Sequence, residues 1–144
     1  MIEYRENENL SFEEYYDFLK RSDLGGQYPK ERFEERIRRL LARRSVAITA
    51  RNDEGKLIGI AFGATDFTYF LFVTDLGVDR AYAKQGIGSE LLVRLQEAAG
   101  GKDDITVVTV AHETVTGFYE KCGYVSENRL FWKRCNLWSE FKVI

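Results

Sequence analysis

The hydrophobic residues of this chain follow extended spacing first and helical spacing next. Residues 2–6 (IEYRE) alternate as a short strand does. The stretch SFEE at residues 11–14 matches a capping box, in which the serine and the last glutamate each satisfy a free amide at a helix start. We therefore expect a helix over residues 12–21 that stops before Gly25-Gly26.

A second amphipathic helix is expected to begin near Pro29. Its apolar face consists of Phe33, Ile37, Leu40 and Leu41. Arginines at positions 36, 38, 39, 43 and 44 alternate with glutamates, which is typical of a solvated helix face and not of a nucleic-acid patch.

Residues 45–78 contain three β-rich runs separated by turns. Residues 52–55 (NDEG) are a hairpin signal, and a second turn falls around Thr65-Asp66. The third run, residues 69–78, is apolar on both faces, which predicts a central strand covered on both sides. Gly77 lies inside this run, where a glycine often marks a bulge or a close approach to the backbone, so we expect the strand to be interrupted there.

Helical spacing returns after residues 85–88 (QGIG) and ends at Gly100-Gly101. The apolar face of this helix consists of Ile87, Leu91, Leu92, Leu95 and Ala98. A short buried strand is expected over residues 105–110, and a helix from Val115 to Cys122. Two further β-type runs, residues 124–132 and 137–144, close the chain.

This order of elements predicts one mixed α/β domain over residues 1–144. The composition is 44% hydrophobic and 31% charged with a net charge of −2, which gives no general attraction to nucleic acid or to an anionic membrane. No apolar run approaches the roughly 20 residues of a membrane span, and no signal-peptide pattern opens the chain, so a cytoplasmic location is expected. With two dispersed cysteines and a single histidine, His112, we expect no metal site, and we interpret Cys122 as a buried thiol.

The two glycines at Gly86 and Gly88 open a helix, where unpaired amides and the helix dipole favour an anion. They fit neither familiar nucleotide motif. A dinucleotide fingerprint needs a third glycine where the chain has Leu91, and a phosphate-binding loop needs a Gly-Lys-Ser/Thr sequence that is absent. From the glycines alone, an ordinary helix start and an anion site remain equally open.

Together with its neighbours, this stretch resembles a known family. The segment GVDRAYAKQGIGSELL (residues 77–92) is similar to the pyrophosphate-binding motif of GNAT-type N-acetyltransferases, and GFYEKCGYV (residues 117–125) is similar to their second signature. The resemblance covers residues 45–132 well and the termini only by topology. It departs from the family at Ala83, where an arginine or glutamine is usual, and in lacking an asparagine after residues 105–110.

The resemblance implies a GNAT-like fold, with a mostly antiparallel central sheet, a splayed central strand and about four flanking helices. It also implies acetyl-CoA as co-substrate. The amide of Val78, beside Gly77, would polarise the thioester carbonyl, and Tyr119 would protonate the coenzyme A thiolate, although a core tyrosine is its alternative. The pyrophosphate would be surrounded by Lys84, Gln85, Gly86, Ile87, Gly88 and Ser89.

The base that takes a proton from the amine is less defined. Asp75 is a lone carboxylate in a nearly all-apolar strand, so it must be paired, hydrated or protonated. It is a candidate base, with a structural acid as the alternative. Glu113 and His112 are further candidates. Tyr28 either lines the acceptor pocket or is an ordinary surface tyrosine.

The leading interpretation is an N-acetyltransferase that moves an acetyl group from acetyl-CoA to a primary amine of a small molecule or protein. The amine would attack directly in a ternary complex, since no cysteine is placed to form an acyl-enzyme. The alternative is a non-catalytic acyl-CoA-binding module of the same fold. Dimerisation through residues 132–138 is a further expectation.

Overall fold

A five-stranded sheet forms the centre of the protein, and its strands lie in the order in which they occur in the chain. A computed structural model describes all residues from 1 to 144. The first four strands pair antiparallel, and the last pairs parallel to its neighbour. The strands are β1 (Glu3–Glu6), β2 (Val46–Arg51), β3 (Leu57–Thr65), β4 (Phe70–Val78) and β5 (Thr106–Thr109).

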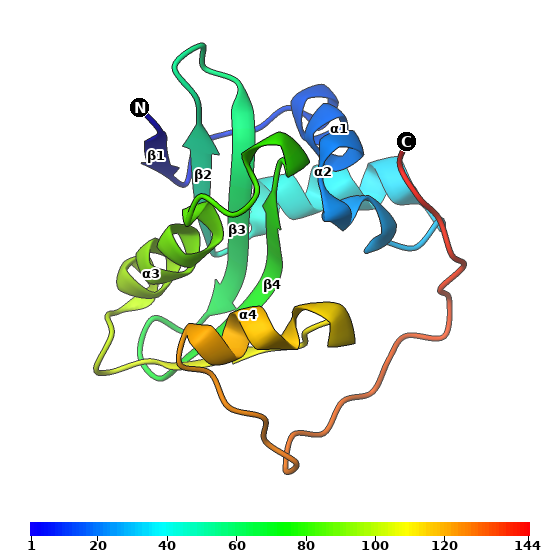
Figure 1. The fold of residues 1–144 in the computed structure, drawn as a ribbon. Helices are drawn as coiled ribbons and strands as arrows, with labels where there is room; N and C mark the ends of the chain where they lie inside the picture. Colours follow the sequence, from blue (N-terminus) through cyan, green and yellow to red (C-terminus); the bar gives the residue numbers. More distant parts are fainter.

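Helices cover both faces of this sheet (Figure 1). They are α1 (Phe12–Arg21), α2 (Phe33–Arg43), α3 (Ile87–Ala99) and α4 (Thr116–Lys121), with short 3-10 turns η1 (Asp23–Gly26), η2 (Arg80–Tyr82) and η3 (Glu113–Val115). Helices α1 and α2 bury one hydrophobic core against the sheet, and α3 buries a second core on the opposite face. The predicted α/β architecture, with a mostly antiparallel sheet and four helices, is therefore confirmed.

The start of α1 fulfils half of the predicted capping box. The Ser11 hydroxyl accepts a hydrogen bond from the Glu14 amide at 3.1 Å. The Glu14 side chain does not return to the start of the helix, and it instead forms an ion pair with Arg51 at 2.7 Å. The prediction was wrong on this second bond because Arg51, a buried guanidinium from β2, provides a stronger, charge-assisted partner.

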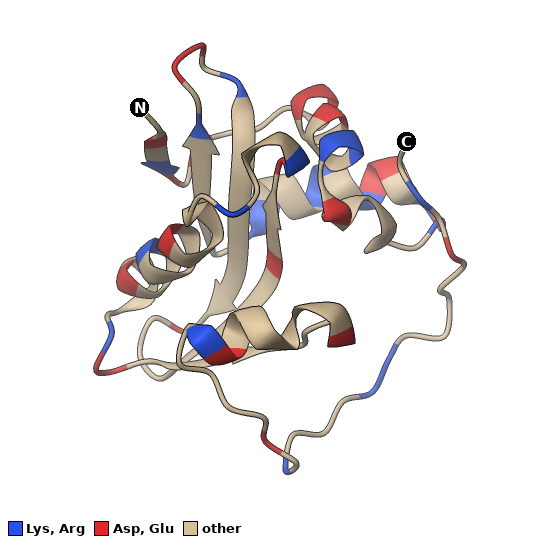
Figure 2. Ribbon diagram, in the orientation of Figure 1, with Lys and Arg blue, Asp and Glu red and all other residues tan.

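Helix α2 begins four residues later than the sequence suggested. Arg32, immediately before Phe33, has a left-handed backbone (φ 51°), so a helix cannot pass through it. The expected solvated face is confirmed, because Arg38 and Arg39 form ion pairs with glutamates one turn earlier, each at 3.1 Å. Figure 2 shows acidic and basic residues interspersed along these helices.

Strand β4 is irregular, but at a different position from the expected one. The register slips where Asp75 faces Phe62 and Val73 faces the next residue of β3, so the extra residue of the bulge is Thr74. Gly77 lies in regular register, and the expected interruption there was wrong. A Cβ atom at Gly77 would come within 2.5 Å of Leu24 in η1, so this glycine permits a close approach of the α1–α2 layer.

Coverage of the sheet is also less complete than predicted. Phe70 and Phe72 of β4 are 57% and 43% exposed, so the strand is covered on both faces only at its other end. Strand β5 was expected to be buried, but it is the edge strand of the sheet, and Thr106 is exposed. The helices α1 and α2 pack over β2 and β3 and do not reach this corner.

The two C-terminal strands predicted over residues 124–132 and 137–144 are absent. This segment runs along the outside of the molecule (Figure 1) and rejoins it where the Lys30 and Val143 amides donate to Ser139 and Gly25. No strand adjoins it, and an apolar alternation forms a strand only where another strand accepts its hydrogen bonds. Dimerisation through residues 132–138 stays a prediction.

Candidate active site

The site is built around the point where β4 and β5 separate. The two strands pair only from Phe70–Thr106 to Val73–Thr109. Beyond this last pair β4 continues to Val78, whereas β5 ends, so the edge of β4 opposite β3 has no neighbour. At the fork itself, the Thr109 hydroxyl donates to the carbonyl of Val73 at 3.0 Å.

The free edge of β4 presents the amide of Val78 to this opening. The Asp79 amide donates to Ile58 of β3 at 2.8 Å. Because bonded and non-bonded pairs alternate in an antiparallel ladder, the adjacent pair, Val78 with Gly59, is a non-bonded one. The Val78 N–H group therefore points away from β3, whereas that of Gly77 points into the ladder.

The loop that leads into α3 has an unusual supply of donors. None of the amides from Lys84 to Ser89 donates a hydrogen bond to any protein atom. Gly86 has a positive φ of 79°, with nothing within 4 Å of where a Cβ atom would lie, and Lys84 has a φ of 61°. Six consecutive free amides at a helix start are a ready site for a phosphate-type anion.

Buried polar contacts fix this loop to the rest of the molecule. Asp79 is only 4% exposed, and it forms an ion pair with Arg21 of α1 while its carboxylate accepts from the Ala81 amide at 2.9 Å. Ile87 is buried in the core under α3. The two ends of the loop before α3 are thus anchored to the fold.

Tyr119 of α4 reaches the fork from the α3 side of the sheet. Its hydroxyl lies near that of Thr109, and its ring packs edge-on against Tyr124 at 5.4 Å. Burial raises the pKa of Tyr119, and the contact with Thr109 only partly offsets this effect. The phenol is therefore protonated at neutral pH and can act as a proton donor.

Asp75 lies on the opposite face of the sheet, under the α1–α2 layer. The residue is 3% exposed, and its carboxylate accepts hydrogen bonds from Gln27 and Thr74, each at 2.7 Å, and from the Tyr28 hydroxyl. Burial raises the pKa of Asp75, although the hydrogen bonds from Tyr28 and Thr74 oppose the shift. Tyr28 is half-buried, so it is not the ordinary surface tyrosine considered as one alternative.

Comparison with known proteins gives this arrangement a family. The sequence model of the acetyltransferase (GNAT) family matches residues 9–124. The protein belongs to this family. The chain is 39% identical over 56 residues to glucosamine 6-phosphate N-acetyltransferase 1 of Oryza sativa subsp. japonica, a match that covers 39% of this chain and 34% of that protein. It spans about a third of the length of the curated relatives it matches.

Solved structures show the same fold. A crystal structure from Deinococcus radiodurans R1 matches 92% of this chain and 88% of its own, with 26% identity and a TM-score of 0.71. The aminoglycoside N-acetyltransferase AAC(6')-Iy, solved in complex with CoA, has a TM-score of 0.68 at 16% identity, and the match covers 94% of this chain and 95% of that one. At this identity the second likeness shows the fold alone.

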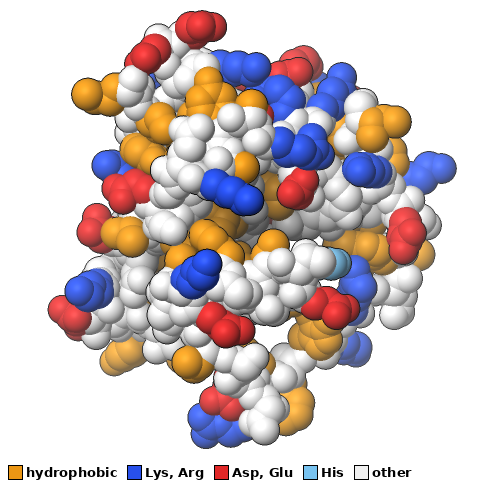
Figure 3. Space-filling model, in the orientation of Figure 1, with side chains coloured by type: hydrophobic (Ala, Val, Ile, Leu, Met, Phe, Trp, Pro, Cys, Tyr) orange, Lys and Arg blue, Asp and Glu red, His pale blue; other side chains and the backbone are white.

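In this family member, the remaining candidates lie around the start of α4. His112 and Glu113 are both exposed, and the His112 ring is 2.9 Å from the Thr114 hydroxyl. Cys122 was expected to be buried, but it is only half-buried, with its sulfur 3.8 Å from the Ser89 hydroxyl. Figure 3 shows apolar side chains along the line where the start of α3 meets α4, and the Phe118 ring would lie 3.2 Å from a Cβ atom at Gly88.

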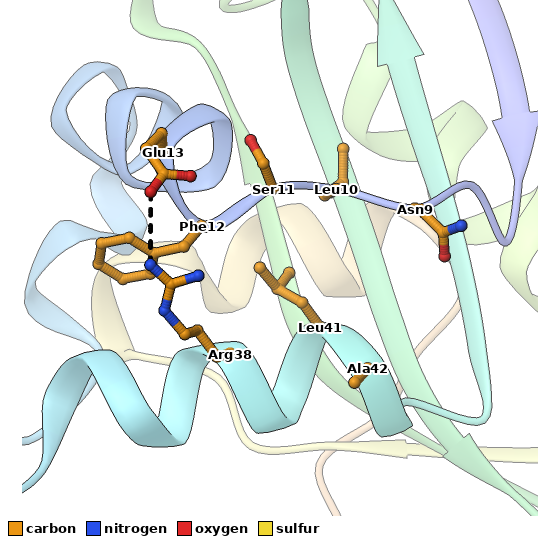
Figure 4. Close-up of a pocket in the computed structure, with 8 residues that line it drawn as sticks. All are labelled: Asn9, Leu10, Ser11, Phe12, Glu13, Arg38, Leu41 and Ala42. Atoms are coloured by element: carbon orange, nitrogen blue, oxygen red, sulfur yellow. Dashed lines mark hydrogen bonds and ion pairs between the residues drawn. The ribbon is translucent and has the colours of Figure 1, made fainter.

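Other parts of this family member carry less chemistry. A pocket of about 250 Å³ lies between residues 9–13 and α2, and the ion pair of Arg38 with Glu13 crosses it at 3.3 Å (Figure 4). It lies away from the glycine loop and the fork. No three His, Cys, Asp or Glu side chains gather in a way that could hold a metal ion, and none of the helices has the length and hydrophobicity to span a bilayer.

Sequence reasoning missed several residues that shape the site. Gln27 and Thr109 were not identified, and Thr74 was not recognised as the bulge. The one available signal was Asp75 itself, because a carboxylate in an apolar strand requires donors. Which donors satisfy it depends on tertiary contacts that no local pattern records.

Proposed function

We propose that this protein is an acetyl-CoA-dependent N-acetyltransferase that acetylates a primary amine of a small molecule or of a protein. The observation that carries the proposal is the row of six free amides from Lys84 to Ser89, held next to the free edge of β4. A long ligand with a pyrophosphate at one end and amide groups in its arm fits both features. Coenzyme A is such a ligand, and a structural neighbour, AAC(6')-Iy, has been solved with it.

Each part of the site has a role in this reaction. The amides of residues 85–89 surround the pyrophosphate, and Lys84 adds a positive charge. Ile87 contributes only its amide, because its side chain is buried in the core. The amide of Val78 donates to the thioester oxygen, where negative charge develops as the amine attacks. Gly77 contributes by admitting Leu24 of η1 against β4.

The proton transfers divide between the two faces of the sheet. An alkyl ammonium, with a pKa of about 10.4, must lose a proton before it can attack. We assign this proton to Asp75, whose raised pKa makes it a better base than an ordinary aspartate. Tyr119, which stays protonated because burial raises its pKa, donates a proton to the departing thiolate. The amine attacks the thioester directly, without an acyl-enzyme.

The departure at Ala83 is compatible with this proposal. A side chain at this position would add to the binding of the pyrophosphate, but the free amides follow it in sequence and remain available. We expect weaker binding of acetyl-CoA and not its loss.

The test measures binding and turnover separately. Acetyl-CoA should raise the melting temperature of the purified protein, because a ligand that binds only the folded state stabilises it by about 2.7 kcal/mol at a hundredfold excess over Kd. NAD and ATP serve as comparators and should shift it less. A panel of primary amines, including glucosamine 6-phosphate, is then assayed for release of the coenzyme A thiol.

Tyr119→Phe and Tyr124→Phe form a matched pair, since the two rings touch but only Tyr119 lies beside Thr109. We expect kcat to fall by about a hundredfold in Tyr119→Phe with acetyl-CoA binding retained, and to stay near the original in Tyr124→Phe. Binding without turnover of any amine would favour the non-catalytic acyl-CoA-binding module. Absence of acetyl-CoA binding would refute both functions.

A further inference from the structure

Three side chains under the α1–α2 layer form a hydrogen-bond chain with one possible direction. The Tyr28 hydroxyl donates its single hydrogen to Asp75, and its oxygen is 2.6 Å from the Tyr15 hydroxyl. Because the hydrogen of Tyr28 is already used, Tyr15 must be the donor in the second bond. The chain therefore runs from Tyr15 through Tyr28 to the carboxylate.

This direction leaves one acceptor position on the oxygen of Tyr28. A phenol oxygen can accept two hydrogen bonds, and Tyr15 occupies one of them. Tyr15 and Asp75 are 0% and 3% exposed, whereas Tyr28 is only half-buried. Tyr28 is thus the most exposed of the three residues in this hydrogen-bond chain, and an ammonium N–H group is a suitable donor to its free acceptor position.

No cation neutralises the carboxylate at the end of the chain. Its partners are the neutral side chains of Gln27, Tyr28 and Thr74. Charged and titratable groups around this hydrogen-bond chain come from three parts of the fold. Tyr15 belongs to α1 and Asp75 to β4. Arg44 follows the end of α2, and its positive charge lowers the pKa of Tyr15. The negative charge of Asp75 is therefore available to a cationic ligand.

The hydrogen-bond chain ends close to the fork between β4 and β5. Asp75 lies two residues beyond Val73, the last residue of β4 that pairs with β5. The carboxylate is therefore beside the part of β4 whose outer edge is free, although it lies on the opposite face of the sheet from Tyr119.

We propose that Tyr28 is the residue that contacts the acceptor amine, and that it passes the proton of the amine to Asp75. This inference rests on the function proposed above, because it needs an amine that is deprotonated before it attacks. In the relay, the ammonium N–H bond breaks and its proton moves to the oxygen of Tyr28, while the hydroxyl proton of Tyr28 moves to Asp75. The products are a neutral amine, an unchanged tyrosine and a protonated aspartate.

The remaining protons balance the reaction. The lone pair of the amine forms the new C–N bond, the C–S bond breaks, and Tyr119 protonates the thiolate. The attacking nitrogen loses its second proton to water, as does Asp75, and Tyr119 regains one proton from water. The sum is one ammonium and one thioester converted to one amide, one thiol and one released proton.

Thr74 is an exposed neighbour of Asp75 that also has a hydroxyl group, but it is a poorer relay. Its hydroxyl hydrogen is within reach of two acceptors, the Asp75 carboxylate at 2.7 Å and the carbonyl of Phe62 at 3.2 Å. Aliphatic alcohols are also far weaker acids than phenols, whose pKa is about 10 and close to that of the amine. We therefore expect Thr74→Val, which removes one hydrogen bond from Asp75, to lower kcat/KM much less than Tyr28→Phe does.

The test is the pH profile of kcat/KM for wild type, Tyr28→Phe, Asp75→Asn and Thr74→Val, with the best amine from the panel. Near pH 7 we expect Tyr28→Phe and Asp75→Asn each to be about 10 to 100-fold slower than wild type. The defect should shrink as the pH approaches about 10, where the amine is neutral without help. It should also shrink at pH 7 with a less basic, fluorinated analogue of the same amine.

Tyr16→Phe is the matched control. Tyr16 packs against Phe33, as Tyr28 does, but it takes no part in the hydrogen-bond chain. It should match wild type at every pH. A defect of Tyr28→Phe that is constant with pH, or that the fluorinated amine does not reduce, would assign Tyr28 to packing and overturn the inference. So would a defect in Asp75→Asn or Thr74→Val without one in Tyr28→Phe.

Failure of the proposed function has a different signature. In that case the wild type itself binds no acetyl-CoA or acetylates no amine, and both proposals fall together. If wild type turns over and only the behaviour of Tyr28→Phe disagrees, the relay fails and the N-acetyltransferase function stands.

Discussion

Gly77 lies where the α1–α2 layer comes nearest to the backbone of β4. A Cβ atom there would be 2.5 Å from Cδ1 and 2.7 Å from Cγ of Leu24, which is itself buried. Because η1 holds Leu24 in place, an alanine at position 77 forces the two layers apart. We expect Gly77→Ala to lower the free energy of unfolding by about 1–3 kcal/mol, measured by urea denaturation.

A glycine in η1 provides the control for this prediction. Gly26 belongs to the same turn as Leu24, and nothing lies within 4 Å of its missing Cβ atom. Gly26→Ala should therefore be nearly neutral. Adding Leu24→Ala to Gly77→Ala should cost less than the sum of the two single changes. Simple additivity would show that the contact does not explain the glycine.

For Asp75, the sequence indicates burial but not the hydrogen-bond donors. Its isolation in an apolar strand correctly indicated a buried carboxylate that needs donors. Its donors Gln27 and Tyr28 are 48 and 47 residues away in the chain, and they meet it only because η1 packs against β4. Long-range partners of this kind follow from the fold and not from spacing.

At the scale of elements, the start of α3 combines two functions that one substitution can separate. In Ser89→Glu, the introduced carboxylate would lie in the first turn of α3, where its interaction with the helix dipole stabilises the helix by about 0.3–1 kcal/mol. The same charge beside the free amides repels a pyrophosphate. We expect Ser89→Glu to stabilise the free protein slightly and to raise the Kd for acetyl-CoA by about tenfold or more, which corresponds to about 1.4 kcal/mol or more.

Ser89→Gln is the uncharged control of the same size, and it should change both quantities far less. Binding is measured by titration calorimetry and stability by thermal melts without ligand. Unchanged affinity for acetyl-CoA in Ser89→Glu would place the pyrophosphate elsewhere. It would also remove the main support for its binding to the free amides of residues 84–89.

The elements themselves were predicted best where local chemistry decides the outcome. Helix α3 begins after Gly86 and ends before Gly100 as the glycines indicated, and Glu90 pairs with Arg94 at 2.9 Å. The C-terminal strands were predicted wrongly because a strand also requires a neighbouring strand, which alternation cannot supply. The fork between β4 and β5 followed from the family resemblance, since nothing in residues 70–78 shows where pairing stops.

For the whole molecule, two carboxylates, the half-buried Glu8 and the buried Asp75, set opposite pH dependences. Burial alone would raise the pKa of Glu8, but hydrogen bonds from Thr49, Arg51 and Arg5 outweigh it and lower this pKa. Glu8 therefore contributes stability above its unfolded pKa of about 4.3, and this contribution is lost as the pH falls. For Asp75, with a raised pKa, the contribution is complete below about pH 3.9 and is lost as the pH rises.

The stability of the protein should accordingly decline on both sides of a maximum in mildly acidic solution, and Asp75→Asn should remove the decline on the alkaline side. Asparagine fits the site, because its oxygen can accept from Gln27 and Tyr28 while its amide donates to Thr74. The variant should match wild type near pH 4 and exceed it at pH 8, by about 1.4 kcal/mol for each unit of the upward pKa shift. Urea denaturation at a series of pH values measures this difference.

Since the same change should slow acetylation, Asp75 would then be a residue that favours activity over stability. A variant that is less stable than wild type at pH 8 would mean that the charge itself holds η1 to β4, and Asp75 would be a structural acid.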